Sequence, residues 1–224
     1  MKKLIHCASA LAIGLPMSMG VAHAAEGYYG KVDGTYSFAG RMNFSTPARG
    51  GFPNLLGSGP RDTDKGFSGG GIGVGRSWDS GWRVEAEVRR HSTDMKKDFE
   101  VLSGKGEATL LMVNGYMDFN TDSFVQPYVG AGIGYGMFDI KAATSPAPSN
   151  QVANGDANNL AYQVQAGLGL RMSETMSLDL GWRYIGTDQL KISLTSVQPP
   201  TAAGYKTEVD YHESSVTVGL RMHF

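Results

Sequence analysis

Apolar and polar residues alternate along most of the chain beyond its first 27 residues. In residues 28–38, tyrosine, glycine, valine and phenylalanine at even positions alternate with mostly polar residues at odd positions. The same two-residue period returns in residues 82–89 and 211–224. Successive side chains of a β-strand point to opposite faces, so this period predicts strands with one apolar and one polar face.

Turn residues divide this pattern into eight predicted strands. Short turns at 79–81, 120–123 and 173–176 join three pairs of strands as hairpins. The faces of the second and fourth strands are ambiguous from the sequence, and Asn114 and Asp118 are assigned to the polar face of the fourth. The predicted strands are 28–38, 67–78, 82–89, 108–119, 124–138, 161–172, 177–185 and 211–224.

The lengths of the connections distinguish two kinds of β-barrel. A soluble lipocalin-type barrel shows the same alternation with its apolar face inward. Here the short turns alternate strictly with long connections rich in Gly, Pro, Ser and Asn, at about 44–65, 91–105, 139–160 and 186–210. This places all turns at one end and all loops at the other, as in outer-membrane barrels. We therefore predict an all-β, eight-stranded, antiparallel up-and-down transmembrane β-barrel.

The first residues predict a cleavable signal peptide. Lys2 and Lys3 precede an apolar stretch, and Ala22-His23-Ala24 supplies a small-residue cleavage site. We expect residues 1–24 to be removed and residues 25–224 to form one barrel domain. Removing two lysines from 20 basic residues leaves 18 against 21 acidic ones, a net charge of −3. So balanced a charge does not indicate a nucleic-acid partner.

Residue types that carry chemistry are sparse. The single cysteine, Cys7, falls within the predicted signal peptide, which excludes disulfides and thiolate metal sites from the remainder. The glycine-rich run 69–75 lacks the Gly-Lys-Ser/Thr ending of a phosphate-binding loop. His91, His212 and His223 lie far apart in the chain. We assign no catalytic, cofactor-binding or metal-binding residue and expect no cofactor.

Two motifs carry a family resemblance. Residues 127–135, PYVGAGIGY, following 114–119, NGYMDF, resemble the region of strands four and five in the opacity-like and OmpA-like eight-stranded outer-membrane barrels. Residues 220–224 resemble the signal by which such proteins reach the barrel-assembly machinery, which assigns that role to Leu220, Met222 and Phe224.

The resemblance implies a monomeric surface protein of the Gram-negative cell outer membrane. Its partners would be outer-membrane lipid, the barrel-assembly machinery and a host or surface ligand at the extracellular loops. Its activity would be structural, antigenic or adhesive and would reside in those loops.

Two alternative functions stay open. The first is a small, low-conductance, porin-like channel. The second is a lipid A-modifying enzyme, because His212-Glu213-Ser214 resembles the His-x-Ser pair of the lipid A deacylases. The acid that this family places beyond the serine has no counterpart in the sequence. Glu213 itself is expected near the loops, where its substitution would cost little.

The polar faces of the strands predict a charge network in the barrel lumen. An eight-stranded barrel is only wide enough for its own side chains, so charges inside it must pair. The competing interpretation is that Gln163, Gln165 and inward glycines leave a gap for small ions. The predicted inward charges are Lys31, Asp33, Arg83, Glu85, Glu87, Arg89, Arg171, Asp179, Arg183 and Arg221.

Overall fold

The computed structural model describes residues 27–45, 59–62, 66–95, 103–119, 122–144, 151–188, 190–196 and 205–224. The predicted signal peptide lies outside these residues. The described residues form ten strands: β1 Gly27–Ser45, β2 Gly59–Asp62, β3 Gly66–Ser77, β4 Trp82–Met95, β5 Ser103–Asp118, β6 Val125–Thr144, β7 Gln151–Arg171, β8 Met176–Thr187, β9 Leu190–Ser196 and β10 Tyr205–His223. No helix among the described residues is long and apolar enough to cross a membrane.

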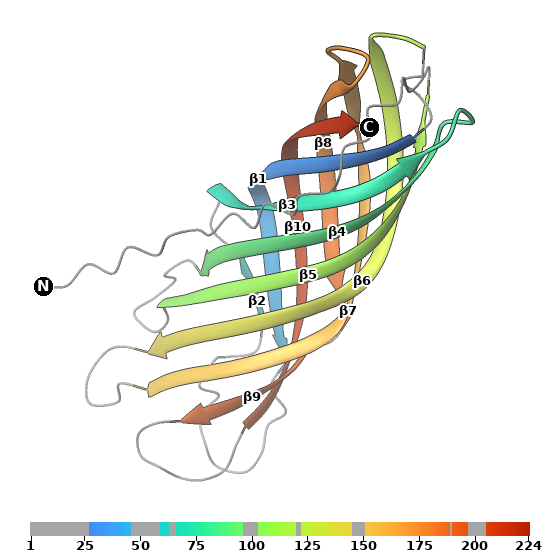
Figure 1. The fold of residues 1–224 in the computed structure, drawn as a ribbon. Coiled ribbons are helices and arrows are strands. Elements are labelled where there is room, and N and C mark those ends of the chain that lie inside the picture. Colours follow the sequence, from blue (N-terminus) through green and yellow to red (C-terminus); the bar gives the residue numbers. More distant parts are fainter. Residues whose placement is uncertain are drawn as a thin grey trace, which may run out of the picture.

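Eight long strands close into a single antiparallel barrel (Figure 1). Their order is β1-β3-β4-β5-β6-β7-β8-β10, and β1 pairs with β10 from Tyr29–His223 to Ser45–Glu208 to close the sheet. The short strand β2 extends the sheet beside β1, and β9 does so beside β10 and β7. The predicted eight-stranded antiparallel barrel is confirmed.

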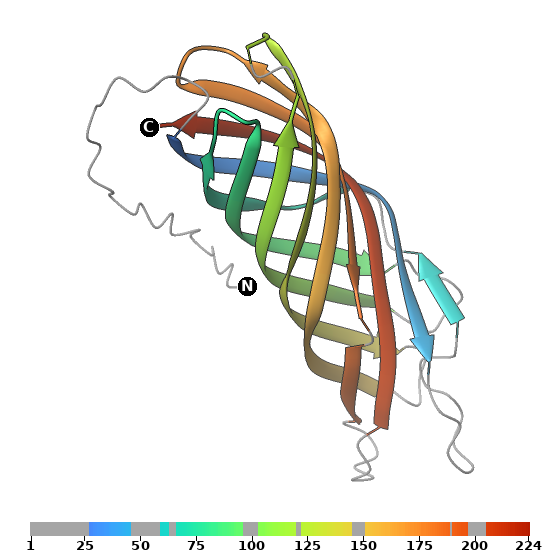
Figure 2. The ribbon, with the colours of Figure 1, turned by 90° about the vertical axis from the view of Figure 1, so that its right-hand side faces the viewer.

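The two ends of the barrel differ. Figure 2 shows the three tight turns and the carboxyl terminus at one end, with β2 and β9 at the other. We name these the turn end and the loop end. In the first turn, Gly81 has a φ of 83° and its backbone N–H donates to the carbonyl of Trp78 at 2.9 Å. Glycine adopts this left-handed conformation without the steric cost of a Cβ atom.

The strands run further toward the loop end than the sequence predicted. The pairing of β6 with β7 continues to Thr144 and Gln151, so most of the predicted connection 139–160 is strand. Likewise β4 and β5 extend into the predicted connection 91–105. The predicted connections 44–65 and 186–210 contain β2 and β9. The prediction was wrong here because backbone pairing continues past the point where one face stops being apolar.

The outer face of the barrel is apolar and the lumen is polar. On β3, Ile72 and Val74 point outward while Gly73 lies against the Glu85 side chain inside, which resolves one ambiguous strand. On β5, Asn114 and Asp118 are buried inside. Each barrel strand carries outward apolar side chains. One example from each strand, all between 37% and 65% exposed, makes up the set Val32, Val74, Val84, Val113, Ile133, Val164, Leu180 and Val218. This inverts the order of a soluble barrel and matches one whose outer surface contacts lipid.

Candidate functional site

Glu87 is the centre of the charge network in the lumen. Its Oε1 accepts hydrogen bonds from Arg89 at 2.8 Å and Arg183 at 2.9 Å. Its Oε2 accepts from the amides of Asn114 at 2.9 Å and Gln163 at 3.1 Å. These partners come from β4, β5, β7 and β8, so one carboxylate links four strands across the lumen.

The other charges of this layer pair around the same centre. Asp33 forms an ion pair with Arg89 and lies 3.9 Å from Arg183. The Lys31 ammonium is 3.7 Å from Asp33 and 3.8 Å from Glu85. All five side chains are almost fully buried. Burial of this kind is tolerated because each charge faces an opposite one.

Aromatic hydroxyls complete the hydrogen bonding of Glu85. The hydroxyls of Tyr29 and Tyr116 each donate to its carboxylate at 3.1 Å. The Gln165 amide donates to Tyr116 at 3.0 Å and accepts from Arg183 at 3.1 Å. The two glutamines that could have lined an ion path are thus bonded into the network.

A second charged layer lies nearer the turn end. Arg83 pairs with Asp118 at 2.6 Å, and Arg221 lies 3.1 Å from Asp179 and 3.8 Å from Asp118. Next to this layer, at the turn end, Arg171 lines a cavity of about 20 Å³, which has room for roughly one water molecule. The turn end of the lumen is therefore closely packed.

Toward the loop end the lumen becomes apolar. Leu110, Phe138 and Ile185 are buried there. Beside this apolar layer, Glu213 receives a hydrogen bond from Tyr211 and forms an ion pair with His91, whose side chain is 3% exposed. The structure argues against the expectation that Glu213 is a tolerant position, because its side chain is buried in the lumen against Tyr211 and His91.

Inward glycines make room for large neighbours and leave no gap beside them. A Cβ on Gly132 would lie 1.9 Å from the Asn114 side-chain oxygen, and one on Gly130 would lie 2.3 Å from the Tyr116 ring. The glycines of β3 also face neighbouring side chains, since a Cβ on Gly73 would lie 3.1 Å from the Glu85 side chain. The space next to these glycines is occupied by side chains of adjacent strands.

The structure places all ten predicted charges on the inner side of the barrel. Nine side chains are buried, and Arg171 is half-buried at the turn end. Sequence reasoning missed the pair of His91 and Glu213. The alternation in β10 could have predicted part of this pair, because Glu213 is two residues before the buried Ser215 and so faces the same side. That the network acts as a plug stays a prediction.

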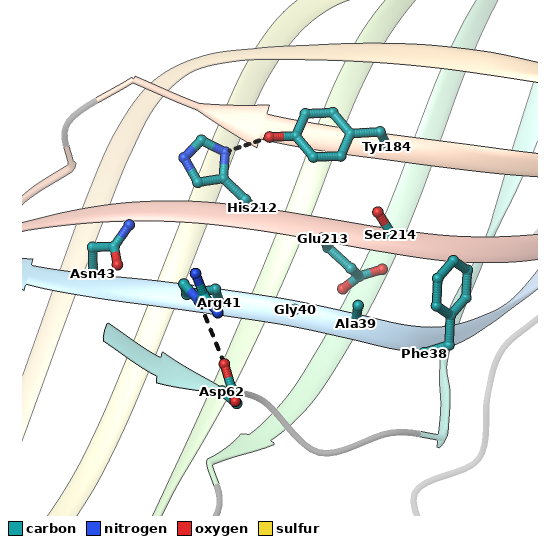
Figure 3. A pocket seen from close by; sticks show the side chains of 10 residues that line it. All are labelled: Phe38, Ala39, Gly40, Arg41, Asn43, Asp62, Tyr184, His212, Glu213 and Ser214. Carbon is teal, nitrogen blue, oxygen red and sulfur yellow. Dashed lines mark hydrogen bonds and ion pairs between the residues drawn. The ribbon is translucent and has the colours of Figure 1, made fainter. Parts of the chain in front are cut away.

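A pocket of about 520 Å³ lies on the outer face near the loop end, over β1, β2, β8 and β10 (Figure 3). It forms beside a β-bulge in β1 between Ser37 and Ala39. Because the bulge adds one residue, Phe38 and Ala39 are both exposed and Arg41 moves to the outer face. The pocket is lined by Phe38, Ala39, Gly40, Arg41, Asn43, Asp62, Tyr184, His212, Glu213 and Ser214.

This pocket contains the His-x-Ser pair but assembles no catalytic relay among the described residues. His212 Nδ1 bonds the hydroxyl of Tyr184 at 3.0 Å, and the two rings stack (Figure 3). Glu213, the acid between His212 and Ser214, is turned into the lumen. No described group of three His, Cys, Asp or Glu side chains is arranged to hold a metal ion.

The sequence matches, over residues 7–224, the family described as outer membrane protein beta-barrel domain. The chain belongs to this family. Outer membrane protein PagN of Salmonella typhimurium is a relative, 22% identical over 73% of this chain and 75% of its own length. A putative adhesin of Rickettsia bellii is 26% identical over 53% of this chain, which spans about half (54%) of that relative. The predicted resemblance and the outer-membrane location are confirmed.

A solved structure has a similar fold. The outer membrane protease OmpT from Escherichia coli superposes with a TM-score of 0.58, covering 88% of this chain and 97% of that one. The two sequences are only 8% identical, so the likeness concerns the fold alone.

Proposed function

We propose that this protein is an adhesive surface protein, whose barrel anchors a binding platform at the loop end to the outer membrane. The observation that supports this best is the height of the strands. On β6 the outward apolar row ends at Met137, with Asp139 next on that face, yet the strand continues to Thr144. Seven further residues at about 3.4 Å each, tilted by about 40°, raise the hairpin roughly 20 Å.

The paired backbone makes this extension a rigid support. β6 and β7 remain in register from Ile140–Gly155 to Thr144–Gln151. Binding residues are commonly held on loops that a stable scaffold positions. An extension of paired strands above the lipid has no use for membrane anchoring alone, and it suits contact with another surface.

The filled lumen and the relatives favour the same function. A barrel crossed by paired charges leaves little room for transport, so its outward parts remain as the place for activity. PagN is named as an outer membrane protein and the Rickettsia relative as a putative adhesin. Both names agree with a surface role.

Adherence of whole bacteria tests the proposal. A non-adherent Gram-negative strain expressing the chain is compared with one expressing a trimmed variant, in which Asn-Gly replaces residues 139–156. Because Phe138 and Ala157 are register partners, the shortened hairpin keeps its pairing. We expect the full chain to raise the number of bacteria bound to cultured epithelial cells, and the trimmed variant to lose this gain.

A control variant separates binding from folding. Glu174→Ala changes an exposed residue at the turn end and should leave adherence unchanged. Heat-modifiable migration of both variants verifies a folded barrel. Adherence no higher than that of the empty strain, or equal for the full and trimmed chains, would refute the adhesive function.

A further inference from the structure

The outer-face pocket lies where the barrel surface changes from apolar to polar. On β10 the outward side chains change from Val216 to Ser214 and then His212. On β1 the change falls between Phe38 and Arg41. A membrane-spanning surface makes this change where hydrocarbon gives way to lipid headgroups. The pocket therefore lies at headgroup depth, in the leaflet at the loop end.

Two basic side chains meet in this pocket. Arg41 and His212 are direct register partners on β1 and β10, and both are on the outer face. Side chains directly opposite in an antiparallel pair are about 5 Å apart at Cβ, so a single ligand group can reach both. Asp62 is opposite Arg41 on its other side, with a carboxylate oxygen 3.4 Å from Nε. An anion between Arg41 and His212 would be within reach of both side chains.

The donors of both side chains are oriented for such an anion. Asp62 engages Nε of Arg41, and the guanidinium carries two further nitrogens with N–H donors. When the Tyr184 hydroxyl donates to Nδ1 of His212, the neutral imidazole carries its proton on Nε2. In that tautomer His212 presents an Nε2–H donor to the pocket. Phosphate, with several acceptor oxygens, suits this set of donors.

We propose that the pocket binds the phosphorylated headgroup of a glycolipid from the outer leaflet. Its volume of about 520 Å³ falls within the range of roughly 300–1,000 Å³ typical of sites that hold small molecules. Phe38 and Ala39 give it an apolar side that continues into the band beginning at Val216. An amphiphile could place its phosphate at Arg41 and its acyl chains along that band. A free anion would gain nothing from the apolar side.

This inference rests on the outward orientation of the loop end proposed above, but its test does not depend on adherence. Refolded protein in detergent micelles is titrated with bisphosphorylated lipid A and observed by native mass spectrometry. We expect the unaltered chain to retain one lipid, and the double variant Arg41→Gln/His212→Gln to bind at least about tenfold more weakly. The retained lipid should have its unaltered mass, since the pocket assembles no catalytic relay.

Arg90→Gln is the matched control. Arg90 is also an exposed arginine on the outer face near the loop end, paired with Glu107 at 3.1 Å, but it lies on β4 away from the pocket. We expect its substitution to leave lipid retention unchanged. Equal losses in the control and the double variant would mean general surface attraction and would overturn the proposal.

Two further ligands distinguish the sources of the phosphate. Dephosphorylated lipid A should bind weakly, and inorganic phosphate at the lipid concentration should not displace the bound lipid. Equal retention of the dephosphorylated lipid, or displacement by inorganic phosphate, would contradict a phosphoglycolipid site. Heat-modifiable migration shows that each variant has folded, so a loss of binding reports on the pocket.

Discussion

The charge network makes a sharp prediction for Glu87. Five buried cations, Lys31, Arg83, Arg89, Arg183 and Arg221, face five buried acids, Asp33, Glu85, Glu87, Asp118 and Asp179. Glu87→Gln keeps the shape of the side chain but leaves five cations against four acids. Arg183 then retains only Asp33, at 3.9 Å, as an acidic neighbour within ion-pair distance among the described residues.

The expected cost follows from the burial of the pair. Removing one partner of a buried ion pair costs about 3–5 kcal/mol, because the remaining charge stays in a region of low polarity. The new amide also turns N–H donors toward the arginines or the Asn114 and Gln163 amides, which are donors themselves. We therefore expect Glu87→Gln to lower the free energy of unfolding by about 3–5 kcal/mol.

Urea unfolding of the refolded protein in micelles, followed by tryptophan fluorescence, measures this change. With a slope of about 2–3 kcal/mol per molar urea, the midpoint should fall by roughly 1–2.5 M. Glu107→Gln is the control, since its pair with Arg90 at 3.1 Å is exposed and is worth about 0–1 kcal/mol. Arg183→Gln added to Glu87→Gln restores the charge balance and should recover part of the loss.

The result that would refute this reasoning is a similar, small shift for both single variants. It would mean that water screens Glu87 as it screens Glu107, so the lumen would be wet. If Glu87→Gln fails to fold, the rebalanced double variant still tests the argument, because it should fold better than the single one.

Three further predictions concern packing, conductance and assembly. Gly132→Ala should lower the free energy of unfolding in urea by about 1–3 kcal/mol, because its Cβ would meet the Asn114 side chain. Gly115→Ala, whose Cβ would have nothing within 4 Å, should cost far less, and equal costs would contradict the packing argument. Planar-bilayer recordings of the unaltered protein should show no large, steady single-channel conductance, and such a conductance would make the barrel a small porin. Phe224→Ala keeps the backbone hydrogen bond from residue 224 to the Tyr28 carbonyl at 2.9 Å but removes the ring of the proposed assembly signal, so it should lower the heat-modifiable, folded fraction in outer membranes. An unchanged fraction would argue against that role.

The two-residue period was sufficient to predict the barrel and which charges face the lumen. Each strand within the lipid has one apolar face, so the parity of a residue determines its side. Beyond the lipid both faces are wet, and the sequence of β6 from Asp139 to Thr144 no longer shows where pairing ends. The loop-end extensions were therefore missed.

Partners across the lumen and the outer-face pocket could not be predicted for a different reason. Glu87 and Gln163 are separated by 76 positions, and their contact depends on how far each strand is staggered around the closed barrel. Arg41 has the parity of the inward Ser37, so unbroken alternation places it inside. The bulge after Ser37 reverses that parity, and no residue type in the sequence marks it.

The linkage of four strands through Glu87 has a consequence for the order of assembly. While the sheet is still open, a chain that has formed β4 and β5 holds the carboxylate of Glu87 without Gln163 and Arg183, which arrive with β7 and β8. Asp33 on β1 likewise approaches Arg183 only when the sheet curls round. Neutralisation of Arg183 by Glu87 and Asp33 is thus completed only as the barrel closes. A partly inserted sheet bears unmatched charges that resist transfer into lipid, so the native charge pattern itself penalises release of the barrel before its last strand is in place.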